Sequence, residues 1–188
     1  MISKDEMKSY LKENLVKNRY IHTLGVAKTA IELSRLYNVD ETKAEIAALA
    51  HDIAKNKTLS ELKEIINKNN IKLNYDEAKN KELWHSIVGP IVAREVFKID
   101  DNEILSAIRW HTTGKENMSK LDKVIYMADM IEPNRNFPNV EEIRREAFID
   151  LDKAMLLGLN HTIKYLLEKG ISIDINSIRA RNYLLRSK

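Results

Sequence analysis

The chain has 188 residues, 44% of them hydrophobic, and its 31 basic residues nearly balance its 28 acidic residues, leaving a net charge of +3. This length fits a single domain with a substantial core, and so small and scattered a positive excess argues against nucleic-acid binding. The sequence contains no cysteine, which excludes disulfides, thiolate metal sites and a cysteine nucleophile.

The sequence has the features of a helical protein outside the membrane. The first ten residues, MISKDEMKSY, lack the apolar run of a signal peptide, and no apolar stretch approaches the roughly 18 residues that span a bilayer. We therefore expect a cytoplasmic protein without a membrane partner. Glycine and proline are scarce, and strand-like alternation is nearly absent apart from ISIDIN at 171–176. The sequence predicts an all-α fold in a single domain.

Helix start signals recur along the chain. Ser3, Thr58 and Asn139 are each followed three residues later by a glutamate, which is the pairing of a capping box. Further N-cap candidates are Asp40, Asp101, Ser119 and Asp150. Gly170 is typical of the position just after a helix end. The helical pattern is weakest at three segments that we interpret as loops within the domain, namely 70–80, 112–119 and 133–139.

The stretch AALAHDIAK at 47–55 places two polar residues in an otherwise apolar helix. The i, i+3, i+4, i+7, i+8 rule puts His51 and Asp52 on the same face as three alanines. Alanines allow a neighbouring helix to come close, so both polar side chains are expected to point away from water. A buried carboxylate needs a cation, a metal or several donors. Because imidazole and carboxylate both bind divalent metals, this pair is a candidate metal site.

Three further histidines and a second aspartate have similar apolar, helical surroundings. His22 lies in RYIHTLGVAK, His85 in LWHSIVG, His111 in IRWHTTG and Asp129 in IYMADMIEP. A buried helical aspartate without a counter-ion is rare, and four histidines that are all ordinary core residues would be unusual. We therefore favour a metal site built from these residues. His161, in GLNHTIKY, has no acidic neighbour on a buried face, and we interpret it as an ordinary exposed or capping histidine.

The order of these residues and the strings around them resemble a known family. The chain is similar to the HD-domain superfamily of metal-dependent phosphohydrolases, and within it to the bacterial YqeK-like symmetrical bis(5'-nucleosyl)-tetraphosphatases, in RYIHTLGVA, ALAHDIAK, LWHSIVGPIVA, IRWHTTG, IYMADMIEPNR and ARNYLL. The resemblance runs from about Arg19 to Leu185. It implies one HD-type helical bundle over residues 1–188, with a metal-binding core at about 19–135 and C-terminal helices at 139–188 that complete the nucleotide site.

The resemblance also implies a ligand set and a metal. The metal ligands would be His22, His51, Asp52 and Asp129. The ion is usually iron in this subfamily, although nitrogen and oxygen ligands also suit manganese, cobalt, nickel or zinc. Asp52, His85 and His111 would be catalytic, with the two histidines either contacting phosphate or completing a second metal position. The number of ions, one or two, stays open at this point.

The implied reaction splits a dinucleoside polyphosphate. Diadenosine tetraphosphate would be cleaved symmetrically into two ADP by attack of a metal-activated water. The substrate-binding candidates are Arg19, Lys55, His85, His111, Thr112, Arg135, Arg181, Asn182 and Tyr183. For Lys55 the plain alternative is a solvated helix end, and for 181–183 it is a last amphipathic helix.

Other functions are compatible with the same residues. Another HD-type phosphohydrolase could act on mononucleotides, on a guanosine alarmone or on a cyclic dinucleotide with the same metal centre. A non-catalytic helical binding module could retain a metal for stability alone. A nucleic-acid partner is disfavoured by the near-neutral charge. The sequence decides neither homodimer formation nor a preference for adenosine over guanosine.

Overall fold

The computed structural model describes residues 1–186, and within them every regular element is helical, which confirms the predicted all-α fold. These residues form eleven α-helices and one short 3₁₀ turn. The helices are α1 Lys4–Asn14, α2 Lys17–Tyr37, α3 Glu41–Ala50, α4 Leu59–Lys68, α5 Tyr75–Lys79, α6 Trp84–Phe97, α7 Asn102–Trp110, α8 Lys120–Ile131, α9 Val140–Ala147, α10 Leu151–Glu168 and α11 Ile175–Arg186, with the 3₁₀ turn η1 Lys81–Leu83 before α6.

Side-chain caps begin most of the helices, as predicted. Ser3 and Thr58 each accept a hydrogen bond from the N–H of the glutamate three residues on, and that glutamate accepts the cap N–H in return. The other confirmed caps are Asp40, Asp101, Ser119 and Asp150. Gly170 follows α10 with a φ of +64°, a left-handed conformation that glycine adopts without strain.

Three local predictions are wrong. Asn139 precedes α9 in a left-handed conformation, with a φ of +68°, and makes no side-chain cap, because capping needs an extended backbone at this position. The strand-like segment 171–176 is instead a link at 171–174 followed by the first two residues of α11, and Asp174 accepts a hydrogen bond from the backbone N–H of Asn176. The segment 70–80 contains the helix α5, which Asn74 starts with a capping box.

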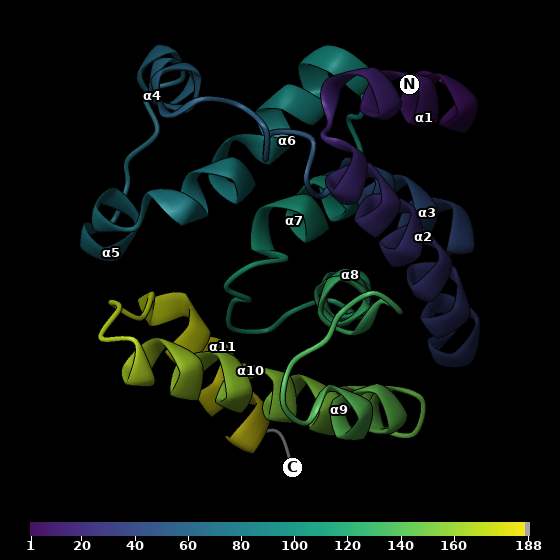
Figure 1. The fold of residues 1–188 in the computed structure, drawn as a ribbon, viewed down its shortest axis with the longest axis vertical. Coiled ribbons are helices and arrows are strands. Elements are labelled where there is room, and N and C mark those ends of the chain that lie inside the picture. The colour runs from purple at the N-terminus through teal and green to yellow at the C-terminus, as the bar shows by residue number, and fades with distance from the viewer. Residues whose placement is uncertain (187–188) are drawn as a thin grey trace.

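Helix α8 lies in the middle of the bundle (Figure 1). It packs against α2, α3 and α7 on one side and against α9 and α10 on the other. Helix α11 packs on α10 and completes the C-terminal layer, while α1, α4 and α6 lie at the opposite end of the molecule. Residues presented by α8 can therefore reach both the interior and the C-terminal layer.

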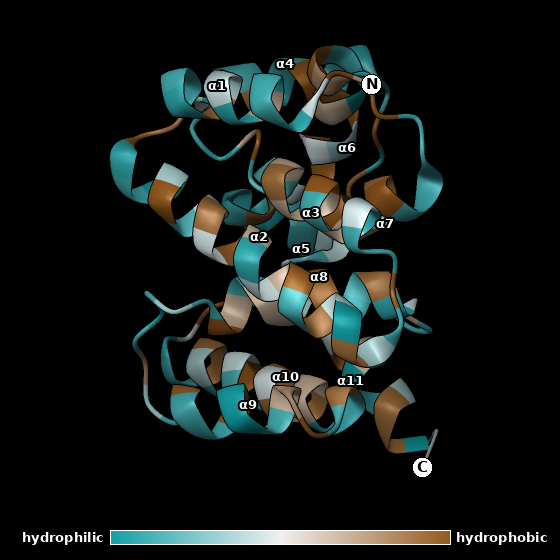
Figure 2. Cartoon of the chain, turned by 90° about the vertical axis from the view of Figure 1, so that its right-hand side faces the viewer, coloured by the Kyte–Doolittle hydropathy of each residue, from teal (hydrophilic) through white to brown (hydrophobic). Residues whose placement is uncertain are grey.

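Apolar side chains fill the space between the helices. Figure 2 shows hydrophobic residues gathered on α3 and α8 and hydrophilic residues on the outer helix faces. Ala44, Ala47 and Ala48 are fully buried, which confirms the predicted face of α3 and lets α2, α7 and α8 pack around it. Within residues 1–186, no helix combines the length and the hydropathy that crossing a membrane requires.

Candidate metal centre

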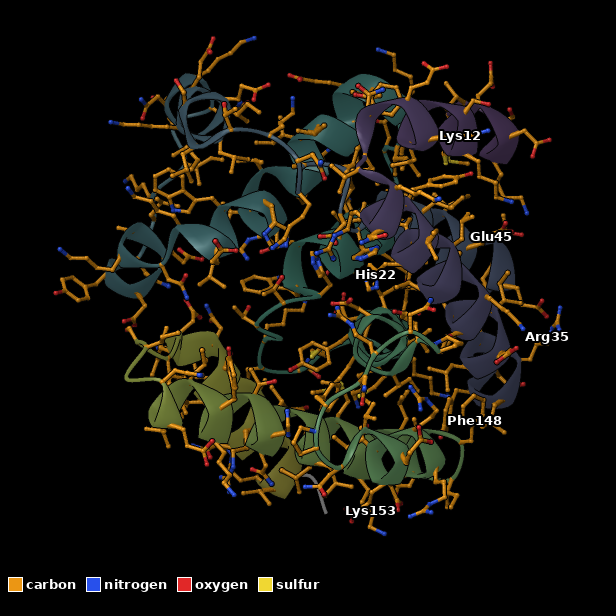
Figure 3. The ribbon with its side chains drawn as sticks, in the orientation of Figure 1. Lys12, His22, Arg35, Glu45, Phe148 and Lys153 are labelled. Carbon is orange, nitrogen blue, oxygen red and sulfur yellow. The ribbon has the colours of Figure 1, made fainter. Side chains whose placement is uncertain are left out.

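Four histidines and two aspartates, which lie in or directly after five different helices, meet in the middle of the molecule, as the sequence predicted. Figure 3 shows the labelled His22 pointing into the bundle, whereas the labelled charged residues lie at its periphery. All six are buried except Asp129, which is half-buried. The six residues are His22 in α2, His51 and Asp52 at the end of α3, His85 in α6, His111 at the end of α7 and Asp129 in α8.

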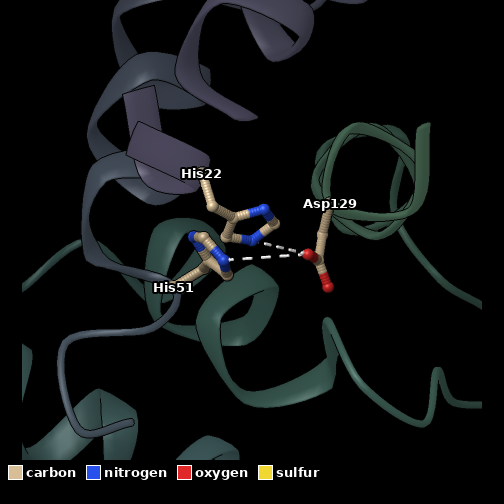
Figure 4. Close-up of side chains that lie close together, drawn as sticks. All are labelled: His22, His51 and Asp129. Carbon is tan, nitrogen blue, oxygen red and sulfur yellow. Dashed lines mark ion pairs between the residues drawn. The ribbon is translucent and has the colours of Figure 1, made fainter. Parts of the chain in front are cut away.

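We call His22, His51 and Asp129 the His22 half of the cluster (Figure 4). Nε2 of His22 lies 3.0 Å from Oδ1 of Asp129, and Nε2 of His51 lies 4.0 Å from the same oxygen. Both Nε2 atoms are buried, and neither has a hydrogen-bond partner among the described residues. A buried polar atom left unpaired costs about 1–3 kcal/mol. A cation bound by these two nitrogens would remove that cost.

We call His85 and His111 the His85 half, and Asp52 lies between the two halves. Oδ2 of Asp52 is 3.4 Å from Nε2 of His51. Its other oxygen, Oδ1, is 3.3 Å from Nε2 of His85 and 3.7 Å from Nε2 of His111. The Nε2 atoms of His85 and His111 lie 3.3 Å apart. Asp52 therefore faces both halves with a different oxygen toward each.

Each histidine presents Nε2 to the centre because its Nδ1 is already occupied. Nδ1 of His51, His85 and His111 donates to the carbonyl three residues earlier, over 2.6, 2.6 and 2.8 Å. Nδ1 of His22 instead lies 3.1 Å from a carboxylate oxygen of Glu132. Such bonds fix the tautomer that leaves a lone pair on Nε2. Two rings in this tautomer cannot share a hydrogen bond, so the His85–His111 contact calls for a shared proton or cation.

The two carboxylates and His85 are in the protonation states that suit metal binding. Burial alone would lower the pKa of His51, but Asp52 and Asp129 outweigh it and raise that pKa, so His51 would release a proton on binding a metal. Burial alone would raise the pKa of Asp52, but the neighbouring histidines outweigh it and hold that pKa well below its usual range. Burial opposes ionisation of Asp129 too, but the nearby His22 and Arg135 lower its pKa. Burial lowers the pKa of His85 to about 3, so this ring is neutral at neutral pH. Neutral imidazoles and ionised carboxylates are the forms that bind a metal.

The donor atoms fit a divalent metal. Two groups each place their ligand atoms within 4.8 Å of one another, the first being the His22 half and the second His51, Asp52 and His111. His51 is a member of both groups. Asp52 belongs to the second group, but its Oδ2 faces His51 and so also lies near the first group. Two imidazole nitrogens and two carboxylates form a borderline donor set that suits iron, manganese, cobalt, nickel or zinc. The unpaired Nε2 atoms of His22 and His51 are what such an ion would satisfy.

Two arginines predicted to bind phosphate contact the carboxylates of the centre. Nη1 of Arg19 donates to Oδ2 of Asp52 over 2.8 Å. Arg135 donates through Nε to the backbone oxygen of Asp129 over 2.8 Å and through Nη2 to its carboxylate. Both cations therefore lie beside the proposed ligands, where they offset the negative charge of the two aspartates.

Lys55 and Thr112 border the His85 half. Helix α3 ends at Ala50, earlier than predicted, and Lys55 lies in the turn that follows, with Nζ 3.5 Å from Nδ1 of His85. Thr112 has a buried Oγ1 without a hydrogen-bond partner among the described residues. It lines a cavity of about 200 Å³ together with Asp129. Both residues lie beside the cluster, and their role in substrate binding stays a prediction.

Some predicted residues lie apart from the centre. Arg181 hydrogen-bonds to α10 and Asn182, and Tyr183 hydrogen-bonds to the loop after α7. The nucleotide role of these α11 residues stays a prediction. His161 lies in α10, half-buried, with its ring centroid 4.5 Å from that of Phe137, so it is packed rather than exposed or capping.

Three hollows with shared lining residues lie beside the cluster of histidines and aspartates. The cavity beside Asp129 shares Arg135 with a second hollow, of about 330 Å³, which His22 lines. On its other side it shares Thr112 and Thr162 with a third hollow, of about 290 Å³, lined mainly by apolar atoms of α10 and the segment before α11. Shared lining residues therefore link the three hollows, and we call the linked hollows the groove.

One functional candidate was missed by the sequence reasoning. Glu132 is only 1% exposed and contacts His22. It lies three residues after Asp129, on the same side of α8, within the quoted string IYMADMIEPNR. A second acidic residue one turn beyond a predicted ligand was the available signal.

Comparison with known proteins agrees with this geometry. The model of the HD domain matches residues 19–134. Proteins named "Bis(5'-nucleosyl)-tetraphosphatase, symmetrical" from Bacillus subtilis and Halalkalibacterium halodurans are 40% and 43% identical, with 98% and 93% of both chains covered. The crystal structure of a predicted HD superfamily hydrolase involved in NAD metabolism from Clostridium acetobutylicum is 45% identical over both full chains, with a TM-score of 0.97. The chain therefore belongs to the HD-domain family, as its motifs predicted.

Proposed function

We propose that this chain is a symmetrical bis(5'-nucleosyl)-tetraphosphatase that hydrolyses diadenosine tetraphosphate to two ADP. The observation that carries the proposal is a buried His–Asp centre that lies on a groove and is bordered by Arg19, Lys55 and Arg135. The relatives that bear this name align with nearly the whole chain.

We propose a divalent metal at the His22 half, with iron as the first candidate and manganese, cobalt, nickel or zinc as alternatives. The proposed ligands are His22, His51, Asp52 and Asp129. The ion, when bound, supplies Lewis acidity, which lowers the pKa of water and draws charge from a phosphoryl group. A second ion at Asp52 and the His85 half is the two-metal form of the same proposal.

The surrounding residues bind and orient the polyphosphate. Arg19, Lys55 and Arg135 offer charge-assisted hydrogen bonds, which are stronger than neutral ones. Neutral His85 and its partner His111 lie across Asp52 from the His22 half, where they can hold a proton or a phosphate oxygen. Arg19, His85 and His111 lie in or directly after helices of the packed core, and Arg135 is held by its bonds to Asp129, so their positions are set before substrate arrives.

The groove supports a substrate with a nucleoside at each end. Symmetric cleavage requires the central P–O–P bond at the centre and one nucleoside diphosphate on each side. In this proposal one nucleoside diphosphate occupies the hollow that shares Arg135 with the cavity beside Asp129, and the other occupies the apolar hollow that shares Thr112 with it. Helices α10 and α11 line the apolar hollow, which supports a single domain over 1–188 whose C-terminal helices complete the nucleotide site.

Product analysis in heavy-oxygen water tests the proposed reaction. The metal-loaded protein should convert diadenosine tetraphosphate to ADP alone, with label in only one of the two ADP molecules formed. AMP and ATP as main products would contradict symmetric cleavage. Faster turnover of mononucleotides, a guanosine alarmone or cyclic dinucleotides would favour another HD-type phosphohydrolase. A protein that binds metal but cleaves no nucleotide anhydride would be the non-catalytic module.

A further inference from the structure

Glu132 lies behind His22, at the end of α8, on the side away from the proposed metal. Its side chain is 1% exposed, and Oε1 lies 3.1 Å from Nδ1 of His22. We propose that Glu132 is a positioning residue, whose carboxylate fixes the His22 ring and strengthens its bond to the metal. The inference requires His22 to be a ligand, but it does not depend on which substrate is cleaved.

The place of His22 in the fold explains why it needs a carboxylate. His51 and His111 follow the last residues of α3 and α7, where helix carbonyls lack intrahelical partners and can accept from Nδ1. His22 instead lies well inside the 21-residue helix α2. The carbonyl three residues before it, that of Arg19, already accepts from the hydroxyl of Thr23 over 3.0 Å. An acceptor for Nδ1 of His22 must therefore come from another helix.

The carboxylate of Glu132 is held at both oxygens. While Oε1 accepts from His22, Oε2 accepts from the backbone N–H of Asn134 over 2.8 Å and from its side-chain amide over 2.9 Å. The guanidinium of Arg144, from α9, donates to three backbone carbonyls of the same turn, at residues 131, 132 and 135. A carboxylate fixed in this way can orient the imidazole rather than follow it.

Gly25 provides the space for this carboxylate. It lies three residues after His22 on the same face of α2. A Cβ added to Gly25 would lie 2.5 Å from Oε2 of Glu132, closer than real Cβ contacts allow. A glycine inside a helix is otherwise unfavourable. The absence of a side chain at Gly25 is therefore what allows Glu132 to reach His22.

A carboxylate behind a metal-binding histidine has a known physical effect. It fixes the tautomer with the lone pair on Nε2 and makes that nitrogen a stronger ligand, and changing such a partner typically lowers metal affinity about 10–100-fold. In the cluster, His51, His85 and His111 use uncharged carbonyls instead. His22 is thus the histidine whose affinity for the metal gains most from its partner.

Titration with Co²⁺ alone tests the proposal. The metal-free full chain is titrated with Co²⁺, and the dissociation constant is measured by competition with a chelator and by the visible absorption of the bound ion. Glu132→Ala and Glu132→Gln should both raise the dissociation constant about 10–100-fold. Glu77→Gln is the matched control, because Glu77 is also buried but pairs with Arg109 away from the centre, and it should leave Co²⁺ binding unchanged.

Gly25→Ala tests the same idea without changing the carboxylate. Gly25→Ala should weaken Co²⁺ binding because the added methyl group displaces Glu132, even though alanine favours the helix. This variant tests the proposal if the Glu132 variants fail to fold. Wild-type Co²⁺ affinity in both Glu132→Gln and Gly25→Ala would overturn the proposal. So would an equal loss in Glu77→Gln, or a wild-type chain that binds no Co²⁺. Because the readout is metal binding, failure to hydrolyse the tetraphosphate would count only against the proposed function.

Discussion

The two halves of the cluster differ in how their buried nitrogens are satisfied. In the His22 half, Nε2 of His22 and of His51 have no hydrogen-bond partner within residues 1–186. In the His85 half, Nε2 of His85 and of His111 face each other over 3.3 Å and also face Asp52. A proton can satisfy the second pair, whereas the first needs a cation with several coordination positions. The difference supports the proposed ion at the His22 half and the proposed substrate role of the His85 half.

Removing a proposed ligand of the ion should have the largest effect. We expect His51→Ala or Asp52→Ala to abolish bound metal and activity together, a larger loss than the roughly 10–100-fold caused by changes behind a ligand. Metal analysis and hydrolysis assays on the same sample measure both. Full stoichiometric metal in either variant would contradict the ligand assignment.

The His85 half should respond differently. His85→Ala should retain the first metal, because this ring faces Asp52 from the side opposite to His51. Activity should fall about 10²–10⁴-fold, the range for loss of a group that transfers or holds a proton. Metal content beside kcat separates the two effects. Complete loss of metal in His85→Ala would show that both halves are needed to bind the ion, which would contradict the difference drawn between them.

Replacing the cationic side chains beside the two halves should have a smaller effect on activity. Lys55→Ala and Arg135→Ala should each lower kcat/KM for the tetraphosphate about tenfold to 150-fold, since a charge-assisted hydrogen bond contributes about 1.5–3 kcal/mol. The loss should grow with the number of phosphates in the substrate. Only Arg135→Ala should also weaken metal binding, because Arg135 contacts Asp129 whereas Lys55 contacts His85. A wild-type kcat/KM in both variants would show that Lys55 and Arg135 do not bind the substrate.

The smallest effect is expected outside both halves. His161→Ala should leave metal and activity unchanged, because the ring packs on Phe137 in the C-terminal layer. Loss of that aromatic contact should reduce the free energy of unfolding by about 0.5–1.5 kcal/mol. Chemical denaturation beside a metal assay tests this, and any change in metal content would extend the cluster beyond the six residues.

Local interactions made much of the fold predictable. Ser3 and Thr58 bond to residues three positions away, so the signal and the structure lie in one short segment. The cluster was predictable for another reason, because polar residues such as His51 and Asp52 interrupt an apolar helical period that requires burial.

Contacts between distant segments explain the misses. Glu132 lies 110 positions from His22, so its place one turn after Asp129 could indicate a residue near the site but not the histidine that it contacts. Asn139 has the sequence of a cap, but its left-handed backbone prevents the cap from forming. The segment 171–176 alternates like a strand, yet Asp174 is buried and accepts a hydrogen bond from the side-chain amide of Asn74, a contact no local pattern contains.

The spacing of the ligands has a consequence for how the protein matures. The proposed set begins at His22 and ends at Asp129, and its members are held on the separate helices α2, α3 and α8. In a zinc finger, one short segment supplies all ligands, and metal binding drives folding. A growing chain of this protein holds only part of the set until α8 has been synthesised and packed. We therefore expect folding to precede metallation, so that the cell loads the ion into a finished protein.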